Sequence, residues 1–74
     1  MVTTEDILHV MEAASLPSSA SKLDADAPLV KQGLDSLDMA ELMLAVEKKY
    51  KKAIPVEQAA RLRTINDIVT FLNQ

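Results

Sequence analysis

Three short patterns, each pairing a helix-capping residue with an acid three positions later, constrain the fold of this 74-residue chain. The pairs are Thr3 with Asp6, Asp35 with Asp38, and Thr64 with Asp67. Such a pair is typical of a helix start, because its two side chains accept hydrogen bonds from backbone N–H groups that have no partner inside the helix. We therefore expect three helices to begin at these points.

Apolar residues follow the first and last of these starts at helical spacing. The positions are Ile7, Met11 and Ala14 after the first start, and Ile65, Ile68, Val69 and Leu72 after the last. The first stripe predicts a helix over about residues 4–14, and the second predicts a helix that follows Thr64. Pro55 suits the first turn of a short helix over about 56–61.

In residues 15–34 the apolar side chains recur neither at helical spacing nor in the alternation typical of a strand. The residues expected to end the first helix are Pro17, Ser18, Ser19 and Ser21. Four apolar residues are expected to pin an ordered loop to the core, namely Leu23, Leu29, Val30 and Leu34. Gly33 can adopt a positive φ just before the next helix.

These elements predict an all-α fold: a single domain over residues 1–74, with three main helices, one short helix and a long loop between the first two main helices. One Phe, one Tyr and no Trp indicate an aliphatic core. No apolar run is long enough to span a membrane, and no signal peptide is evident, so a cytoplasmic setting is expected. A net charge of −3 with so few aromatics disfavours nucleic-acid binding. We expect a monomer.

The central helix, predicted from Ser36 to near Lys51, carries more apolar surface than one core-facing side needs. One stripe is Met39, Leu42, Val46 and Tyr50, and a second is Leu37, Ala40 and Leu44, with Met43 and Ala45 filling in. Two interpretations remain open at this point. Either the helix is buried more deeply than usual, or the second stripe is an exposed strip that partners contact.

Ser36 directly follows the predicted cap, Asp35, so its hydroxyl has no evident structural task. A hydroxyl at a helix N-terminus is a favourable position for attaching a phosphate group, because free N–H groups and the positive end of the helix dipole attract negative charge. An ordinary helix-start serine remains the alternative.

The chain offers little for catalysis or metal binding of its own. It has no cysteine, which excludes a thiolate metal site, and no metal site is predicted. His9 is the sole histidine and lies in the first predicted helix. No pair of groups at plausible spacing can serve as nucleophile and base, so no catalytic residue is assigned.

Gly33-Leu34-Asp35-Ser36-Leu37 resembles the G-x-D-S-L signature of the acyl and peptidyl carrier proteins. The resemblance covers nearly the whole chain and includes the helix order, Glu41-Leu42, Ile54-Pro55 and Thr64-Ile65. It implies that Ser36 carries a 4′-phosphopantetheine arm transferred from coenzyme A, flanked by Asp35 and Leu37. The arm would supply the thiol that the polypeptide lacks and would hold acyl intermediates as thioesters.

The same resemblance implies roles for two further groups of residues. The partner-binding face, read by the phosphopantetheinyl transferase and by acyl-transferring, synthase or ligase enzymes, would comprise Asp38, Ala40, Glu41, Leu44 and Glu47. The core that shelters an acyl chain in some members would comprise Leu42, Val46, Tyr50, Ala59, Leu62 and Ile68.

The charge distribution departs from the carriers of fatty-acid synthesis that the chain resembles, many of which stay acidic to the end of the central helix. Residues 1–47 carry −7, whereas residues 48–74 carry +4, and Lys48, Lys49, Lys51 and Lys52 cluster where the central helix ends. These lysines suit the negative end of that helix dipole. Because surface charge affects partner choice, we expect a carrier of a specialised pathway, such as polyketide, lipid-modification or peptide-type assembly. A peptidyl or aminoacyl carrier is one alternative, and a non-covalent helical interaction module is another.

Overall fold

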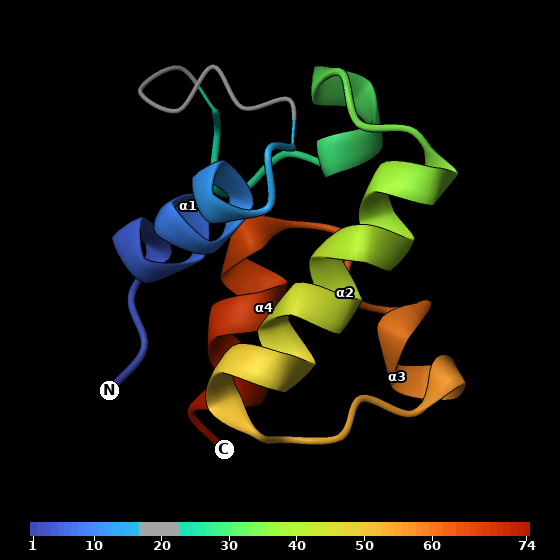
Figure 1. Cartoon of the computed structure of the whole chain (residues 1–74). Coiled ribbons are helices and arrows are strands. Elements are labelled where there is room, and N and C mark those ends of the chain that lie inside the picture. Colours follow the sequence, from blue (N-terminus) through green and yellow to red (C-terminus); the bar gives the residue numbers. More distant parts are fainter. Residues whose placement is uncertain (17–22) are drawn as a thin grey trace.

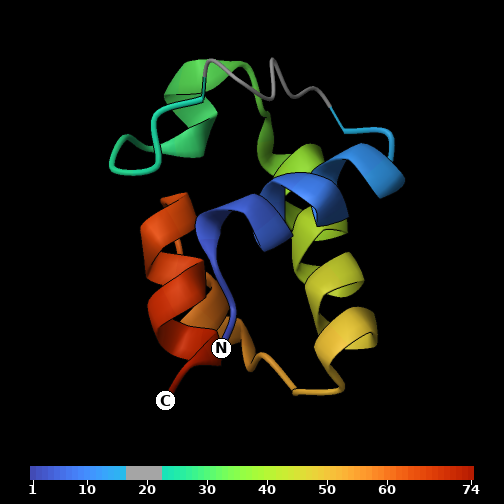
Figure 2. The ribbon, with the colours of Figure 1, turned by 90° about the vertical axis from the view of Figure 1, so that its left-hand side faces the viewer.

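The computed structural model describes residues 1–16 and 23–74, and its regular elements are all helical. In chain order they are α1 (Thr4–Ala13), the 3-10 helix η2 (Leu29–Gln32), α2 (Ser36–Tyr50), α3 (Val56–Ala59) and α4 (Ile65–Leu72). Figure 1 shows α2 passing in front of α4, with α3 beyond the other side of α2, and Figure 2 shows α4 and α2 set apart with α1 reaching across from one to the other. The expected all-α bundle of three main helices and one short helix is confirmed.

All three predicted capping pairs form their hydrogen bonds. Thr3, Asp35 and Thr64 are the N-caps of α1, α2 and α4, and each accepts a hydrogen bond from the backbone of the acid three residues later. That acid in turn accepts one from the backbone of the cap. Each box satisfies donors that a helix start leaves free, which is why the predicted starts coincide with the observed ones.

The core lies where α1 crosses both α2 and α4, as the second view shows (Figure 2). Its fully or nearly fully buried side chains are Ile7, Val10, Met11, Leu16, Leu29, Leu34, Leu42, Met43, Val46, Ile54, Leu62, Ile65 and Ile68. No aromatic ring is among them, and the single Phe and single Tyr pack at the edge. The expected aliphatic core is therefore confirmed.

The two ends of the chain lie close together (Figures 1 and 2). The Asn73 side chain accepts a hydrogen bond from the Val2 backbone N–H (2.8 Å) and donates one to the Val2 carbonyl (2.9 Å). This reciprocal pair fastens the segment before α1 to the end of α4.

The described part of the segment before α2, residues 23–35, contains the helix η2, which sequence reasoning missed. The Leu29 backbone N–H donates to the Arg63 carbonyl (2.9 Å), and the Gln32 side chain donates to the Asp24 and Ala27 carbonyls (both 3.0 Å). A turn of four residues is too short to produce a periodic pattern, and these contacts are distant in sequence. The residues predicted to end the first helix, Pro17, Ser18, Ser19 and Ser21, lie outside the described residues.

One predicted core anchor is wrong, and one helix is shorter than predicted. Leu29 and Leu34 are buried and Leu23 packs against the core, but Val30 is 57% exposed. Val30 directly follows the buried Leu29 on the tight η2 turn, so the two side chains point to different sides. The helix expected over 56–61 ends at Ala59, and its continuation is a turn.

Candidate functional site

Ser36 is the first residue of α2, and the residues around it fix its backbone. Gly33 has a φ of 107°, as the sequence predicted, and this left-handed conformation ends η2. Leu34 is buried and holds the connection to the core. The chain then enters α2 at a defined point, so Ser36 occupies a fixed place relative to the core.

The two acids beside Ser36 are used by the helix cap. The Asp38 backbone N–H donates to Asp35 Oδ1 (2.9 Å), and the Asp35 backbone N–H donates to Asp38 Oδ2 (3.2 Å). Asp35 thus performs the capping task that a serine often performs. Ser36 is exposed, and the helix start does not need its hydroxyl. The fold thus places the Ser36 hydroxyl at the surface, and the hydrogen bonds of the α2 cap are made by Asp35 and Asp38 instead.

A strip of apolar side chains on α2 remains at the surface. Leu37 is 68% exposed and Leu44 is 57% exposed, and Ala40 between them is also exposed. The opposite side of α2 buries Leu42, Met43 and Val46. The structure therefore decides between the two interpretations of the sequence, because α2 is not buried on all sides.

Carboxylates flank this strip. Asp35 and Glu41 are exposed, and Asp38 and Glu47 are half-buried. All the residues assigned to the partner-binding face thus lie on the one helix that begins at Ser36. A partly apolar surface with an acidic border is complementary to a basic protein surface.

A groove of about 470 Å³ opens beside Ser36. It is lined by Pro28, Val30, Lys31, Ser36, Met39, Ala59, Ala60, Leu62 and Arg63. These residues come from η2 and its entry, the first turn of α2, and α3 with the segment after it. Sequence reasoning assigned only Ser36, Ala59 and Leu62 to a site. No sequence pattern marked the other lining residues, because contacts between distant segments bring them together.

The residues predicted to shelter an acyl chain divide into two groups. Leu42, Val46 and Ile68 lie in the closed core, while Tyr50 is half-buried at its edge. Ala59 and Leu62 also line the groove beside Ser36. A role of these six residues in holding cargo stays a prediction.

Among the described residues, one titratable group has a clearly shifted pKa, and it lies at the far end of α2 from Ser36. Burial raises the pKa of Tyr50 above its ordinary value of 10.0, and the negative charge of Asp6 adds to the effect. Among residues 1–16 and 23–74, no cluster of three or more His, Cys, Asp or Glu residues forms a candidate metal site. The site thus consists of an exposed hydroxyl, an acidic and apolar helix face, and a groove.

Comparison with known proteins identifies the family. Residues 7–72 match the family model described as a phosphopantetheine attachment site. The chain belongs to the acyl carrier protein family. It is 38% identical over 73 residues to the acyl carrier protein of Helicobacter pylori strain J99, covering 97% of this chain and 92% of that protein. It is 35% identical over 75 residues to the acyl carrier protein of Campylobacter concisus strain 13826, covering 100% and 96%.

Acyl carrier proteins are carriers and not catalysts, and their attachment domain bears a 4′-phosphopantetheine group. This chain fits that group, because Ser36 offers an exposed hydroxyl at a helix start and the groove beside it leaves room for an arm. No helix of the described residues is long and apolar enough to cross a membrane.

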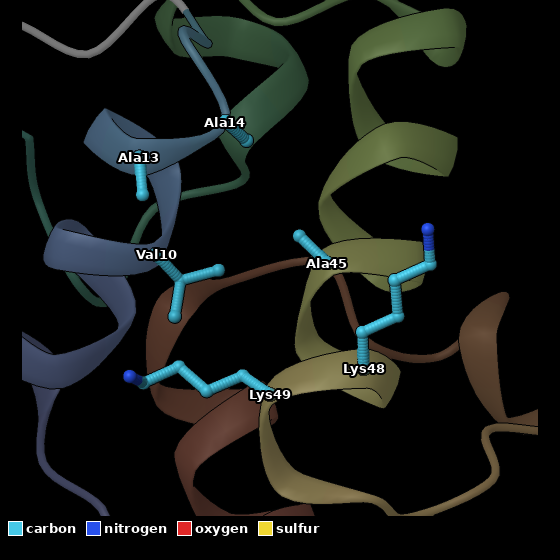
Figure 3. A pocket seen from close by; sticks show the side chains of 6 residues that line it. All are labelled: Val10, Ala13, Ala14, Ala45, Lys48 and Lys49. Atoms are coloured by element: carbon cyan, nitrogen blue, oxygen red, sulfur yellow. The ribbon is translucent and has the colours of Figure 1, made fainter.

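The lysine-rich end of α2 contributes to a second groove, which is separate from Ser36. This groove, of about 430 Å³, lies between α1 and α2 and is lined by Val10, Ala13, Ala14, Ala45, Lys48 and Lys49. Figure 3 shows Val10 and Ala45 facing each other from the two helices, with the lysine side chains below and beside them. Two of the four lysines at the end of α2 thus line a groove between α1 and α2.

Proposed function

We propose that this chain is an acyl carrier whose Ser36 bears the 4′-phosphopantetheine arm. The observation that supports this most directly is that two neighbouring residues have different roles at the start of α2. Asp35 caps the helix, so the exposed Ser36 hydroxyl is free for attachment. The matched attachment-site region includes this position.

Attachment would proceed by transfer from coenzyme A. The Ser36 oxygen forms a bond to the phosphorus next to the pantetheine, the pyrophosphate bond breaks, and adenosine 3′,5′-bisphosphate leaves. The hydroxyl proton passes to a base on the phosphopantetheinyl transferase, since no group of this chain is assigned that role. The N-terminal end of α2 stabilises the phosphodiester charge through its dipole. When bound, the group supplies the thiol on which cargo is carried as a thioester.

The residues around Ser36 would then guide its partners. Asp35, Asp38, Glu41 and Glu47 would attract basic patches on the transferase and on the acyl-transferring, synthase or ligase enzymes. Leu37, Ala40 and Leu44 would supply the apolar contact. Exposed charges of this kind mainly raise association rates and exclude wrong partners. The basic end of α2 supports a carrier of a specialised pathway rather than of general fatty-acid synthesis, because surface charge affects the choice of partner. The setting that we propose is the cytoplasm.

Intact mass spectrometry tests the proposal. The chain is incubated with coenzyme A, Mg²⁺ and a broad-specificity phosphopantetheinyl transferase, alongside Ser36→Ala and Ser15→Ala as a matched control. The parent and Ser15→Ala should each gain one phosphopantetheinyl group, and Ser36→Ala should gain none. Absence of any gain in a chain shown to be folded by circular dichroism would favour a non-covalent interaction module that uses the Leu37–Leu44 strip.

A further inference from the structure

The outward side of α2 carries charges of both signs that have no partner within the helix. Glu41 and Lys48 are both exposed, and they stand before and after the exposed Leu44. Opposite charges on one helix attract each other when they are three or four residues apart. At those spacings Glu41 has only apolar residues and one further acid, and Lys48 has only apolar residues and further lysines. Neither charge is therefore balanced along its own helix.

These two residues share one side of α2 with Leu44. Seven residues make almost two full turns, so Glu41 and Lys48 lie one above the other, and Leu44 lies beside the line that joins them. In Figure 3 the Lys49 side chain extends towards α1, whereas the Lys48 side chain runs along α2 on the other side of that helix. Lys48 is thus positioned for a contact outside the chain.

A partner that matches this side of α2 must be basic opposite the first half of the helix and acidic opposite its end. The side also presents an apolar strip, since Leu37 and Leu44 are 68% and 57% exposed and Ala40 between them is exposed. A second copy of α2 running in the opposite direction has this pattern, because its basic end then faces the acidic half and its strip faces the strip. A parallel copy would place like charges against each other. The complementary charges therefore favour an antiparallel second copy.

We propose that two copies of this chain associate through antiparallel α2 helices, related by a two-fold axis beside Leu44. Glu41 and Lys48 lie three and four residues from Leu44, so the axis brings Glu41 of each copy next to Lys48 of the other. The two Leu44 side chains meet at the centre, and Leu37 lies against the apolar stem of Lys51 of the other copy. This pairing covers the strip proposed for enzyme contacts, but it does not depend on the attachment of an arm.

The pair is weak, because its interface is small. One face of a single helix from each copy is less than stable complexes bury. Exposed ion pairs each add little, so we expect a Kd on the order of 0.1–1 mM at physiological salt. At lower concentrations the chain is the monomer expected from its sequence.

Sedimentation equilibrium of the unmodified chain between about 20 µM and about 2 mM tests the pairing. The average mass should rise from that of one chain towards that of two, and the rise should be smaller when salt is increased from about 0.15 M to about 1 M. NMR amide signals of residues 37–51 should shift with concentration. An average mass of one chain throughout would overturn the proposal and leave the strip to other proteins, and shifts confined to other elements would overturn it too.

Charge reversal locates the contact. Glu41→Lys and Lys48→Glu each make two attractive contacts of the symmetric pair repulsive, so each should raise Kd about tenfold. An equimolar mixture of these two variants should associate like the parent, because one copy then presents two carboxylates and the other presents two ammonium groups. Lys49→Glu is the matched control, with the same charge change at the same helix end, and its Kd should stay within about twofold of the parent's.

Two results with these variants would also contradict the proposal. Association of either single variant at the parent's Kd would assign the contact to another surface. Failure of the mixture to associate would show that the two variants act through fold or net charge and not through this pairing. Circular dichroism checks folding, and any unfolded variant is replaced by Glu41→Gln or Lys48→Gln, which only neutralise a charge and should raise Kd about threefold.

Discussion

Lys52 connects the loop after α2 to the end of α4, and replacing it by Met should destabilise the fold. Its Nζ donates to the Phe71 carbonyl (2.9 Å) and to the Gln74 main-chain oxygen (3.3 Å). The same atom lies 4.8 Å from the centroid of the Phe71 ring. Lys52→Met keeps a flexible apolar stem of similar reach but removes the charge and the donors, so it isolates these contacts from packing.

The expected cost follows from the separate contacts. The bond to Phe71 is short, comes from a charged donor and is partly buried, a class that contributes about 1.5–3 kcal/mol. The longer, exposed bond to Gln74 adds little. The position over the ring contributes about 0.5–1 kcal/mol. Ordering a lysine side chain opposes these terms by up to about 2 kcal/mol. The net loss on substitution should be about 1–2 kcal/mol.

Thermal and urea unfolding followed by circular dichroism measure this loss. For a domain of this size, each kcal/mol lowers Tm by about 4–8 °C. Lys48→Met is the matched control, since Lys48 is exposed near the end of α2, and it should change stability by less than about 0.5 kcal/mol. Equal midpoints for Lys52→Met and the parent would refute the reasoning that Lys52 fastens the end of α4. Loading at Ser36 should be unaffected in both variants.

Two further predictions concern charge. Asp35→Asn and Asp38→Asn retain a side-chain oxygen for the α2 cap while removing a negative charge, so both should slow phosphopantetheine loading severalfold with little change in Tm; Asp35→Ala should in addition cost about 0.5–2 kcal/mol in stability. Loading is measured by mass spectrometry, and loading of both Asn variants at the parent's rate would exclude a role for the acidic face in this reaction. Because the pKa of Tyr50 is raised in the folded chain, the unfolded chain ionises first as pH rises, and stability should fall above about pH 10. An ultraviolet titration of this single tyrosine should give a midpoint above 10.0 when folded, and a midpoint at or below that value would contradict the burial argument.

Local rules predicted the helix starts correctly, and they put the candidate attachment residue at one of those starts. A capping pair acts over four neighbouring residues, so Asp35 and Asp38 indicate the start of α2 whatever surrounds them. The positive φ of Gly33 follows from the same local logic. The assignment of Ser36 needed the family resemblance as well, because many helices start with a serine next to a cap.

The predictions that failed concerned contacts between distant segments. Val30 is an apolar residue beside Leu29, and nothing in the sequence says which of the two faces the core. The four lysines after Glu47 were assigned together to the negative end of one helix, yet Lys52 binds carbonyl oxygens at the end of α4. An amine can satisfy any carbonyl within reach, so the partner depends on which helix end lies nearby.

The sequence alone determined the helical class, the helix starts, the aliphatic core and the position of the candidate attachment serine, because each depends on neighbouring residues or on composition. Only the tertiary structure decided which side of α2 is exposed, and only it brought Lys31 and Arg63 to the groove beside Ser36. The groove forms where η2, α2 and the segment before α4 meet, and a hydrogen bond between Leu29 and Arg63 joins two of these segments. Backbone groups are chemically alike along the chain, so their long-range pairing leaves no mark in the sequence.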